Sequence, residues 1–252
     1  MAQMKSKILF LLLFAFFVSM PSSAGTDVCA VPCSADTVSP RPKRLGRIRA
    51  RAARVDTVRA VPVKLASHNS LTYASPLNGS PRVVDRRNRC QTLDIEGQYA
   101  LGVRLFDFRV RRGDDGTATA AHGRIRYDAD IEAALRFLDS RGGVVVRLML
   151  ENSLLPWRRT DDYAWFQDYA ITLVARYVNI SFVCGRSKVG WDKVARNLPD
   201  EPPIDQYIWR RSSTLNVIPK PARHARRENK DNFKQLNDTV WSMFDFVELL
   251  FE

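Results

Sequence analysis

The stretch GVRLFDFR, residues 102–109, decides the fold of this chain. It is an almost continuous apolar run that is interrupted by Arg104, Asp107 and Arg109. Such a run is typical of a strand that is buried on both faces of a parallel sheet. Because side chains alternate between the two faces of a strand, we expect Asp107 and Arg109 to share one face. The sequence therefore predicts a central strand that carries a paired carboxylate and guanidinium.

Two of the three histidines of the chain lie on either side of this strand in the sequence. His68 lies in the run ASHNS and His122 in the run AHG, and each follows an apolar segment that predicts a strand. A histidine can act as a general acid or a general base near neutral pH. A fixed guanidinium such as Arg109 stabilises the charge that accumulates on phosphoryl oxygens. The pattern indicates cleavage of a phosphodiester, with Asp107 orienting Arg109 or a histidine.

Strands and helices are expected to alternate along the chain. We predict strands over residues 61–66, 103–110, 117–121, 144–150 and 181–184. We predict helices over residues 93–101, 161–177 and 239–251, a helix that Asp128 caps, and a helical turn over 191–196. The polar segment 72–89 is expected to be a loop, and the polar segment 210–237 is expected to be either a loop or disordered. The alternation predicts an α/β fold with a largely parallel sheet, and five or six strands are too few for a full eight-unit barrel.

The first 24 residues have the features of a secretory signal peptide. Lys5 and Lys7 precede an apolar run over residues 8–20, and small residues end the segment at 22–24. A signal-anchor is the alternative. We therefore expect a secreted protein with a signal peptide over 1–24, a basic leader over 25–60 and one catalytic domain over 61–252.

The formal net charge of +12 indicates attraction to anionic surfaces. Much of the excess lies in the leader, where Arg41–Arg44 reads RPKR, the form of a proprotein-convertase site. The leader is either a solvated, flexible segment or a polybasic segment that binds an anionic membrane. No aromatic residue lies among its basic residues, so we expect no nucleic-acid partner. No obligate protein partner is inferred.

The four cysteines are Cys29, Cys33, Cys90 and Cys184. In a secreted chain an even number favours two disulfides, with Cys29–Cys33 or Cys90–Cys184 as candidates. A zinc site built on Cys29 and Cys33 is not favoured, because they have no second close pair. Three glycosylation sequons begin at Asn78, Asn179 and Asn237.

Four motifs, taken in order, resemble the catalytic X-domain of phosphatidylinositol-specific phospholipases C. Residues 67–70, SHNS, resemble the first histidine motif of the eukaryotic branch, and the strand that ends in Asp107-Phe108-Arg109 resembles the bacterial one. His122-Gly123 lies where the second histidine is expected. Residues 148–152, LMLEN, resemble the strand whose glutamate belongs to the metal site of eukaryotic members. The resemblance covers residues 61–152 and is faint afterwards.

This resemblance implies a distorted or incomplete TIM-like (β/α) barrel and a two-histidine mechanism. His68 would act as the general base on the inositol 2-hydroxyl, and His122 would protonate the departing diacylglycerol oxygen. Arg109, with Asp107 beside it, would stabilise the phosphoryl group. The substrate would be phosphatidylinositol or a glycosyl-phosphatidylinositol anchor at a membrane surface, and the product a cyclic inositol phosphate.

The metal requirement has two interpretations. Asn69, Asp107 and Glu151 are oxygen donors of the kind that calcium prefers, and the eukaryotic relatives use an asparagine and a glutamate at the matching positions. Arg109, however, stands where those relatives carry a further acidic ligand, and a guanidinium there would replace the ion. We expect no metal cofactor, so that Asn69 and Glu151 bind substrate.

Further candidates for substrate binding are Arg186 and Lys188, although a solvated basic turn is the simpler interpretation. Trp191, Trp209 and the apolar segment 241–251 can contact lipid, but packing in the core is the simpler role for each. Two rival functions remain. One is a non-catalytic module that binds inositol lipids or anionic glycans. The other is a glycerophosphodiester phosphodiesterase, whose His-Arg-Gly and Glu-x-Asp motifs this chain lacks.

Overall fold

The computed structural model describes residues 64–77, 82–151, 162–185, 197–210, 219–236 and 238–252. The signal peptide, the basic leader, the helical turn expected over 191–196 and several single candidates lie outside these residues. Those candidates are Cys29, Cys33, Asn78, Asn152, Arg186, Lys188, Trp191 and Asn237. Within the described part of the chain, no helix is long and apolar enough to cross a membrane.

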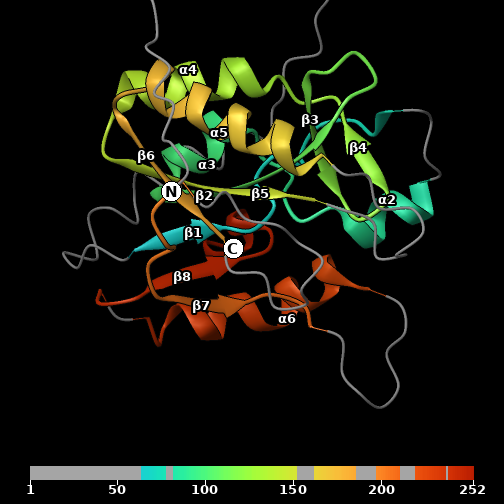
Figure 1. Ribbon diagram of the computed structural model, residues 1–252. Coiled ribbons are helices and arrows are strands. Elements are labelled where there is room, and N and C mark those ends of the chain that lie inside the picture. The colour runs from blue at the N-terminus through green and yellow to red at the C-terminus, as the bar shows by residue number, and fades with distance from the viewer. Residues whose placement is uncertain (1–63, 78–81, 152–161, 186–196, 211–218, 237) are drawn as a thin grey trace, which may run out of the picture. The chain divides into compact units, whose positions relative to one another are not determined.

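A parallel sheet forms the centre of the fold (Figure 1). In spatial order its strands are β7 (Ile204–Tyr207), β8 (Trp241–Phe244), β1 (Leu65–Ser67), β2 (Val103–Arg112), β5 (Val144–Leu150) and β6 (Ile180–Cys184). An antiparallel hairpin, β3 (Ala118–His122) and β4 (Ile125–Tyr127), extends from the carboxyl-terminal half of β2. The expected α/β class and largely parallel sheet are confirmed.

The sheet does not close into a complete barrel within the described residues, because no pairing joins β6 to β7. A single parallel bridge joins Cys184, at the end of β6, to Asp200, which precedes β7. Backbone hydrogen bonds from Cys184 to Pro199 and from Glu201 to Cys184 reinforce this link. The expectation of a distorted or incomplete barrel is confirmed.

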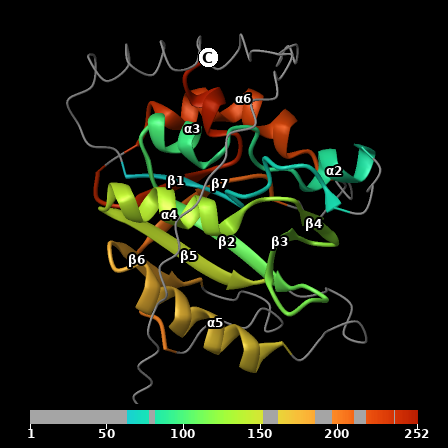
Figure 2. The same cartoon turned by 90° about the horizontal axis from the view of Figure 1, so that it is seen from above.

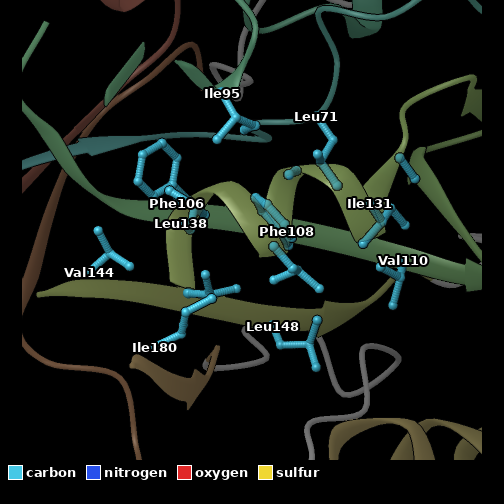
Figure 3. Packing of buried hydrophobic residues seen from close by; sticks show 14 of the residues in the cluster. Leu71, Ile95, Phe106, Phe108, Val110, Ile131, Leu138, Val144, Leu148 and Ile180 are labelled. Carbon is cyan, nitrogen blue, oxygen red and sulfur yellow. The ribbon is translucent and has the colours of Figure 1, made fainter. Parts of the chain in front are cut away.

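Helices flank the sheet (Figure 2). They are α2 (Arg82–Asn88), α3 (Ile95–Ala100), α4 (Ile131–Arg141), α5 (Tyr163–Arg176), α6 (Pro221–Phe233) and the 3₁₀ helix η3 (Val247–Leu250). Helix α4 packs against β5, and α5 packs against β5 and β6. Phe106, Phe108 and Leu148 from the sheet meet Ile131 and Leu138 from α4 in the apolar core shown in Figure 3.

The ends of α4 follow from its sequence. Its cap is Asp130, whose side chain accepts a hydrogen bond of 2.8 Å from the backbone of Ala133. The prediction that Asp128 caps this helix is therefore wrong by two residues, because Asp130 has the same side chain and is the one positioned to accept that bond. Gly142 ends the helix with a positive φ of 63°, a conformation that glycine adopts at little cost.

Three predictions for the polar and carboxyl-terminal segments are wrong. The loop expected over 72–89 contains α2, and the segment 210–237, expected to be a loop or disordered, contains α6, because charged residues form exposed helix faces there. The helix expected over 239–251 is instead β8 followed by η3. A short apolar run that is buried on all sides has no periodicity that separates a strand from a helix. The short strands β4 and β7 were not predicted.

Candidate functional site

Polar side chains gather at the carboxyl ends of the parallel strands. His68 directly follows β1, Arg109 lies in the second half of β2, Glu151 directly follows β5 and Asp245 directly follows β8. His122 is the last residue of β3, whose hairpin begins at the end of β2. Because the carboxyl ends of parallel strands meet at one edge, residues distant in sequence converge there. This edge brings His68, His122, Arg109 and the neighbouring Asp107 together, as the sequence predicts.

The His68 ring is buried, with 7% of the residue exposed, and both of its nitrogens have partners. Nδ1 lies 2.7 Å from Oδ1 of Asp245. Nε2 lies 3.0 Å from Nδ2 of Asn69 and 3.0 Å from Nη2 of Arg109. An ionised carboxylate only accepts and a guanidinium only donates, so the network assigns the proton to Nδ1 and the lone pair to Nε2. The lone pair of Nε2 therefore faces the arginine.

Asp245 was missed by the sequence analysis because it falls in the segment that was expected to be helical. Besides His68, the backbone N–H of Trp209 donates to it at 3.2 Å. Burial alone would raise the pKa of Asp245, but the contact with His68 holds that pKa below its ordinary value. The run Phe244-Asp245-Phe246 repeats the Phe-Asp-Phe of residues 106–108. That repeat was the signal that could have found it.

Asp107 is fully buried and holds two guanidiniums. Its Oδ2 accepts from Nε of Arg109 at 3.1 Å, and its Oδ1 accepts from Nη1 of Arg147 at 2.6 Å. Burial would raise the pKa of Asp107, but these two cations hold it well below its ordinary value. The prediction that Asp107 and Arg109 share one strand face is confirmed. Arg147 was not singled out, because an arginine within an apolar strand has no motif of its own.

Arg109 connects all parts of the site. Its Nε contacts Asp107, its Nη1 lies 3.4 Å from Oε2 of Glu151, and its Nη2 contacts His68. Burial would lower the pKa of Arg109, but Asp107 and Glu151 raise it above its ordinary value, so the guanidinium remains charged. The side chain keeps 17% of its surface exposed. A fixed cation that solvent can reach is suited to receive an anionic group.

His122 lies across from His68. The two ring centroids are 5.9 Å apart and the rings are nearly perpendicular, at 82°. Nδ1 of His122 donates to the backbone oxygen of Asn88 at 2.6 Å, which leaves Nε2 as the nitrogen that can exchange a proton with a ligand. Loss of hydration lowers the pKa of His122, and the charge of Glu151 opposes this shift. The next residue, Gly123, donates its N–H to Glu151 at 2.9 Å and so fixes the turn.

The oxygen donors do not fit a shared calcium ion. Glu151 accepts from Arg109 and from the backbone of Gly123, and Asp107 is bound by two guanidiniums. The Arg109 guanidinium therefore contacts both carboxylates that would have to bind the ion. Of the three candidate donors, the Asn69 Oδ1 alone is buried without a hydrogen-bond partner among the described residues. Calcium requires six to eight oxygen ligands and would be repelled by this cation.

Asn69 has an unusual backbone conformation that places its side-chain amide beside His68. Its φ is 44°, in the left-handed region that asparagine adopts more readily than most residues. Its N–H donates to Oδ2 of Asp107 at 3.1 Å, and its carbonyl accepts from Oγ1 of Thr72 at 2.8 Å. This turn places the amide of Asn69 beside the His68 ring.

Cys90 lies inside the site as a free thiol. It is 1% exposed, and its Sγ lies 3.7 Å from Nδ1 of His122 and 3.8 Å from Nδ2 of Asn69. Burial, reinforced by Asp245, raises the pKa of this thiol well above its ordinary value. Cys184 is also free and contacts Asp200 instead. The predicted Cys90–Cys184 disulfide is therefore wrong, because Cys90 lies in the loop after α2, inside the site, whereas Cys184 ends β6 and contacts Asp200.

A cavity of about 710 Å³ lies between β7 and α6. Its described lining includes the cationic side chains of Arg210, Lys220, Arg223 and Arg227, together with Trp209. Because Trp209 donates to Asp245, the cavity adjoins the carboxylate that holds His68. The sequence analysis favoured packing of Trp209 in the core. In the structure Trp209 lines this cavity and is only partly buried.

No protein-family model matches the chain, and a comparison with curated proteins finds no match. Solved structures do match. A variant of the phosphatidylinositol-specific phospholipase C from Staphylococcus aureus has a TM-score of 0.52 at 13% identity, over 76% of this chain and 91% of that one. The phosphatidylinositol-specific phospholipase C from Listeria monocytogenes has a TM-score of 0.51 at 12% identity, over 77% and 93%. The chain therefore has the fold of these bacterial enzymes, as the motif resemblance implied.

Proposed function

We propose that this chain is a secreted phosphodiesterase that cleaves phosphatidylinositol, or its glycosylated anchors, into diacylglycerol and a cyclic inositol phosphate. The observation that carries the proposal is the placement of His68 and His122 with ring centroids 5.9 Å apart, beside the charged Arg109. A general base, a general acid and a fixed cation are the groups that the reaction needs. The fold shared with bacterial phosphatidylinositol-specific phospholipases C supports the substrate class.

His68 starts the reaction as the general base. Its Nε2 carries the lone pair, so a hydroxyl of the inositol that replaces the Asn69 amide or the Arg109 N–H there can give up its proton. The imidazolium that forms is stabilised by the negative charge of Asp245, whose Oδ1 accepts a hydrogen bond of 2.7 Å from the Nδ1–H of His68. The hydroxyl oxygen then attacks the adjacent phosphorus and closes the cyclic phosphate.

Arg109 stabilises the negative charge on the phosphoryl oxygens as the new bond forms. Asp107 binds its Nε, so the two Nη groups are the part of the fork that is directed toward His68 and Glu151. A cation held in place before the reaction needs no reorganisation during it, which lowers the barrier. Asn69 and Glu151 hold this arrangement and line the space for the headgroup.

His122 completes the reaction as the general acid. It protonates the diacylglycerol oxygen through Nε2 while the phosphorus–oxygen bond breaks. Its pKa is lowered in the free protein, but a bound phosphodiester anion favours the imidazolium and so raises that pKa. Substrate binding therefore favours the protonated form of His122 that acts as the general acid. Proton exchange with solvent returns both histidines to their starting states.

The proposed reaction uses no metal, since Arg109 supplies the positive charge that calcium would otherwise supply. The test is incubation of the purified mature chain with labelled phosphatidylinositol vesicles, with and without a calcium chelator. We expect equal release of diacylglycerol and of cyclic inositol phosphate in both conditions. Loss of activity with the chelator would contradict metal independence.

The same assay separates the two rival functions. Vesicle binding without diacylglycerol release would favour the non-catalytic module that binds inositol lipids or anionic glycans. Cleavage of water-soluble glycerophosphodiesters alone would favour a glycerophosphodiester phosphodiesterase.

A further inference from the structure

A third type of metal-binding side chain lies beside the His68–Asp245 pair. The Sγ of Cys90, a ring nitrogen of His68 and a carboxylate oxygen of Asp245 all lie within 4.8 Å of one another. All three residues are buried. In the proposed phosphodiesterase reaction Cys90 has no task, although its thiol also lies 3.7 Å from Nδ1 of His122. A buried thiol, imidazole and carboxylate that converge on one point need a separate explanation.

These donors match the preference of zinc and differ from those of calcium. Zinc binds thiolate sulfur at about 2.3 Å and imidazole nitrogen or carboxylate oxygen at about 2.0–2.2 Å, so the donors around one ion lie roughly 3–4 Å apart. For the three atoms to bind one ion, the 2.7 Å separation of Nδ1 and Oδ1 would have to widen, and separations of up to 4.8 Å would have to close by about 1 Å. Three protein ligands of mixed type leave one position of a tetrahedral ion open.

The charges at this point also balance for a divalent cation. A thiolate at Cys90 and the carboxylate of Asp245 together carry two negative charges, which one zinc ion neutralises. The guanidinium of Arg109, which contacts His68, is already paired with Asp107 and Glu151. The ion would contact His68 through Nδ1, whereas Arg109 contacts the opposite nitrogen, Nε2. The guanidinium therefore does not occupy the zinc position.

We propose that His68, Cys90 and Asp245 bind a zinc ion, and that this ion inhibits the phosphodiesterase reaction. Binding releases the thiol proton of Cys90 to solvent. The lone pair of Nδ1 binds the ion, so the ring proton of His68 moves to Nε2 and the ring can no longer act as a base there. A half-turn of the Asn69 amide lets Oδ1, which is buried without a partner, accept that proton. Arg109 Nη2 then turns away from Nε2.

Cobalt(II) is the probe that tests this site, because a thiolate ligand gives it a charge-transfer band and tetrahedral coordination gives it intense visible bands. The full chain with Cys29→Ser and Cys33→Ser serves as the parent, so that only Cys90 and Cys184 carry thiols. We expect one cobalt ion per chain, both sets of bands, and their loss when zinc is added. Zinc should also raise the melting temperature of the parent.

Cys90→Ser and Cys90→Ala are the two test variants, and Cys184→Ser is the matched control. We expect both Cys90 variants to lose the charge-transfer band, to bind zinc at least about 100-fold more weakly and to gain no thermal stability from it. The control should behave as the parent does. Cobalt bands that survive in the Cys90 variants, or that vanish in the control, would overturn the proposal, as would a parent that binds no cobalt.

The proposed inhibition by zinc is measured separately, through the rate of phosphatidylinositol cleavage, and it rests on the proposed function. Zinc should slow phosphatidylinositol cleavage by the parent and by Cys184→Ser in proportion to site occupancy, and a chelator should restore the rate. Full cleavage by a zinc-saturated parent would overturn the inhibitory role. If the parent shows no cleavage in any condition, the proposed function fails, whereas the cobalt spectra still decide whether the metal site exists.

Discussion

His68 and Asp245 lie 177 residues apart in the chain and are joined by a 2.7 Å hydrogen bond between Nδ1 and Oδ1. Strands β1 and β8 pair in parallel, with Ser67 opposite Phe244, so the residues that follow them meet at one edge. The first and last strands of the described residues therefore together position the proposed general base, His68. A truncation that removes β8 would remove the carboxylate that fixes the tautomer of His68.

The first prediction concerns Asp245. Changing it to Asn preserves the shape but removes the charge that stabilises the His68 imidazolium, so we expect kcat for phosphatidylinositol cleavage to fall by about 10²–10⁴-fold. Asp205→Asn, an exposed position on the neighbouring strand β7, is the control and should leave kcat unchanged. Equal kcat values for the two variants would show that Asp245 has no role in the reaction.

The second prediction concerns Arg109. Lysine keeps the positive charge but cannot bind Asp107, Glu151 and a phosphoryl oxygen with one planar fork. We expect Arg109→Lys to lower kcat/KM on the order of 10²-fold. Arg112→Lys, at the exposed end of the same strand, provides the comparison. Near-normal turnover of Arg109→Lys would mean that another group stabilises the phosphoryl charge.

The third prediction concerns stability and pH. Asp107→Asn leaves Arg109 and Arg147 without their shared carboxylate, so the free energy of unfolding at neutral pH should fall by about 3–5 kcal/mol. The pKa of Asp107 in the folded protein lies below the ordinary value of 3.8. Its contribution is therefore complete above that pH and is lost as the pH falls below it toward the folded pKa.

Urea unfolding at about pH 5 and about pH 3 checks this sign. The wild-type chain should lose more unfolding free energy between these pH values than Asp107→Asn does, since only the wild type has this depressed carboxyl group. An equal loss in both proteins would contradict the assignment of the shift to Asp107.

The fourth prediction concerns the cavity between β7 and α6. Lys220 and Arg223 line it, whereas Arg226 lies exposed on the same helix outside the lining. Changing both Lys220 and Arg223 to Glu should weaken binding to phosphatidylinositol vesicles at least about tenfold, because each basic residue contributes about 1 kcal/mol at an anionic surface. Changing both Arg226 and Lys230, two exposed residues of α6 outside the lining, to Glu alters the net charge equally and should weaken binding less. A vesicle sedimentation assay at low and high salt measures both, and equal effects would mean that the cavity is not involved.

The sequence predicted the part of the site whose residues lie in local patterns. Each of the predicted site residues follows an apolar run or lies within one: His68, His122, Asp107 and Arg109. Strand β5 was predicted with its observed bounds. Period-two alternation places Asp107 beside Arg109 without any tertiary information. These features depend on a few consecutive residues, so they can be inferred from the chain alone.

Asp245 and Cys90 could not be assigned in the same way. The segment around Asp245 is apolar on all sides, and such a run has no period that separates a strand from a helix. Cys90 was counted as half of a disulfide, because cysteine number predicts bridges but not which thiols meet. The pairing of β1 with β8 brings Asp245 to His68, and the backbone hydrogen bond from Phe246 to Cys90 places the thiol beside them.

The most direct test of the account compares two substrates that differ only in their leaving group. One is phosphatidylinositol, whose diacylglycerol oxygen needs a proton, and the other is a nitrophenyl ester of inositol phosphate, whose leaving group does not. His68→Ala should lose about 10²–10⁴-fold in kcat/KM on both substrates, whereas His122→Ala should lose as much on the lipid and far less on the activated ester. If His122→Ala loses equally on both substrates, or if neither variant loses activity on the lipid, the two-histidine account is contradicted.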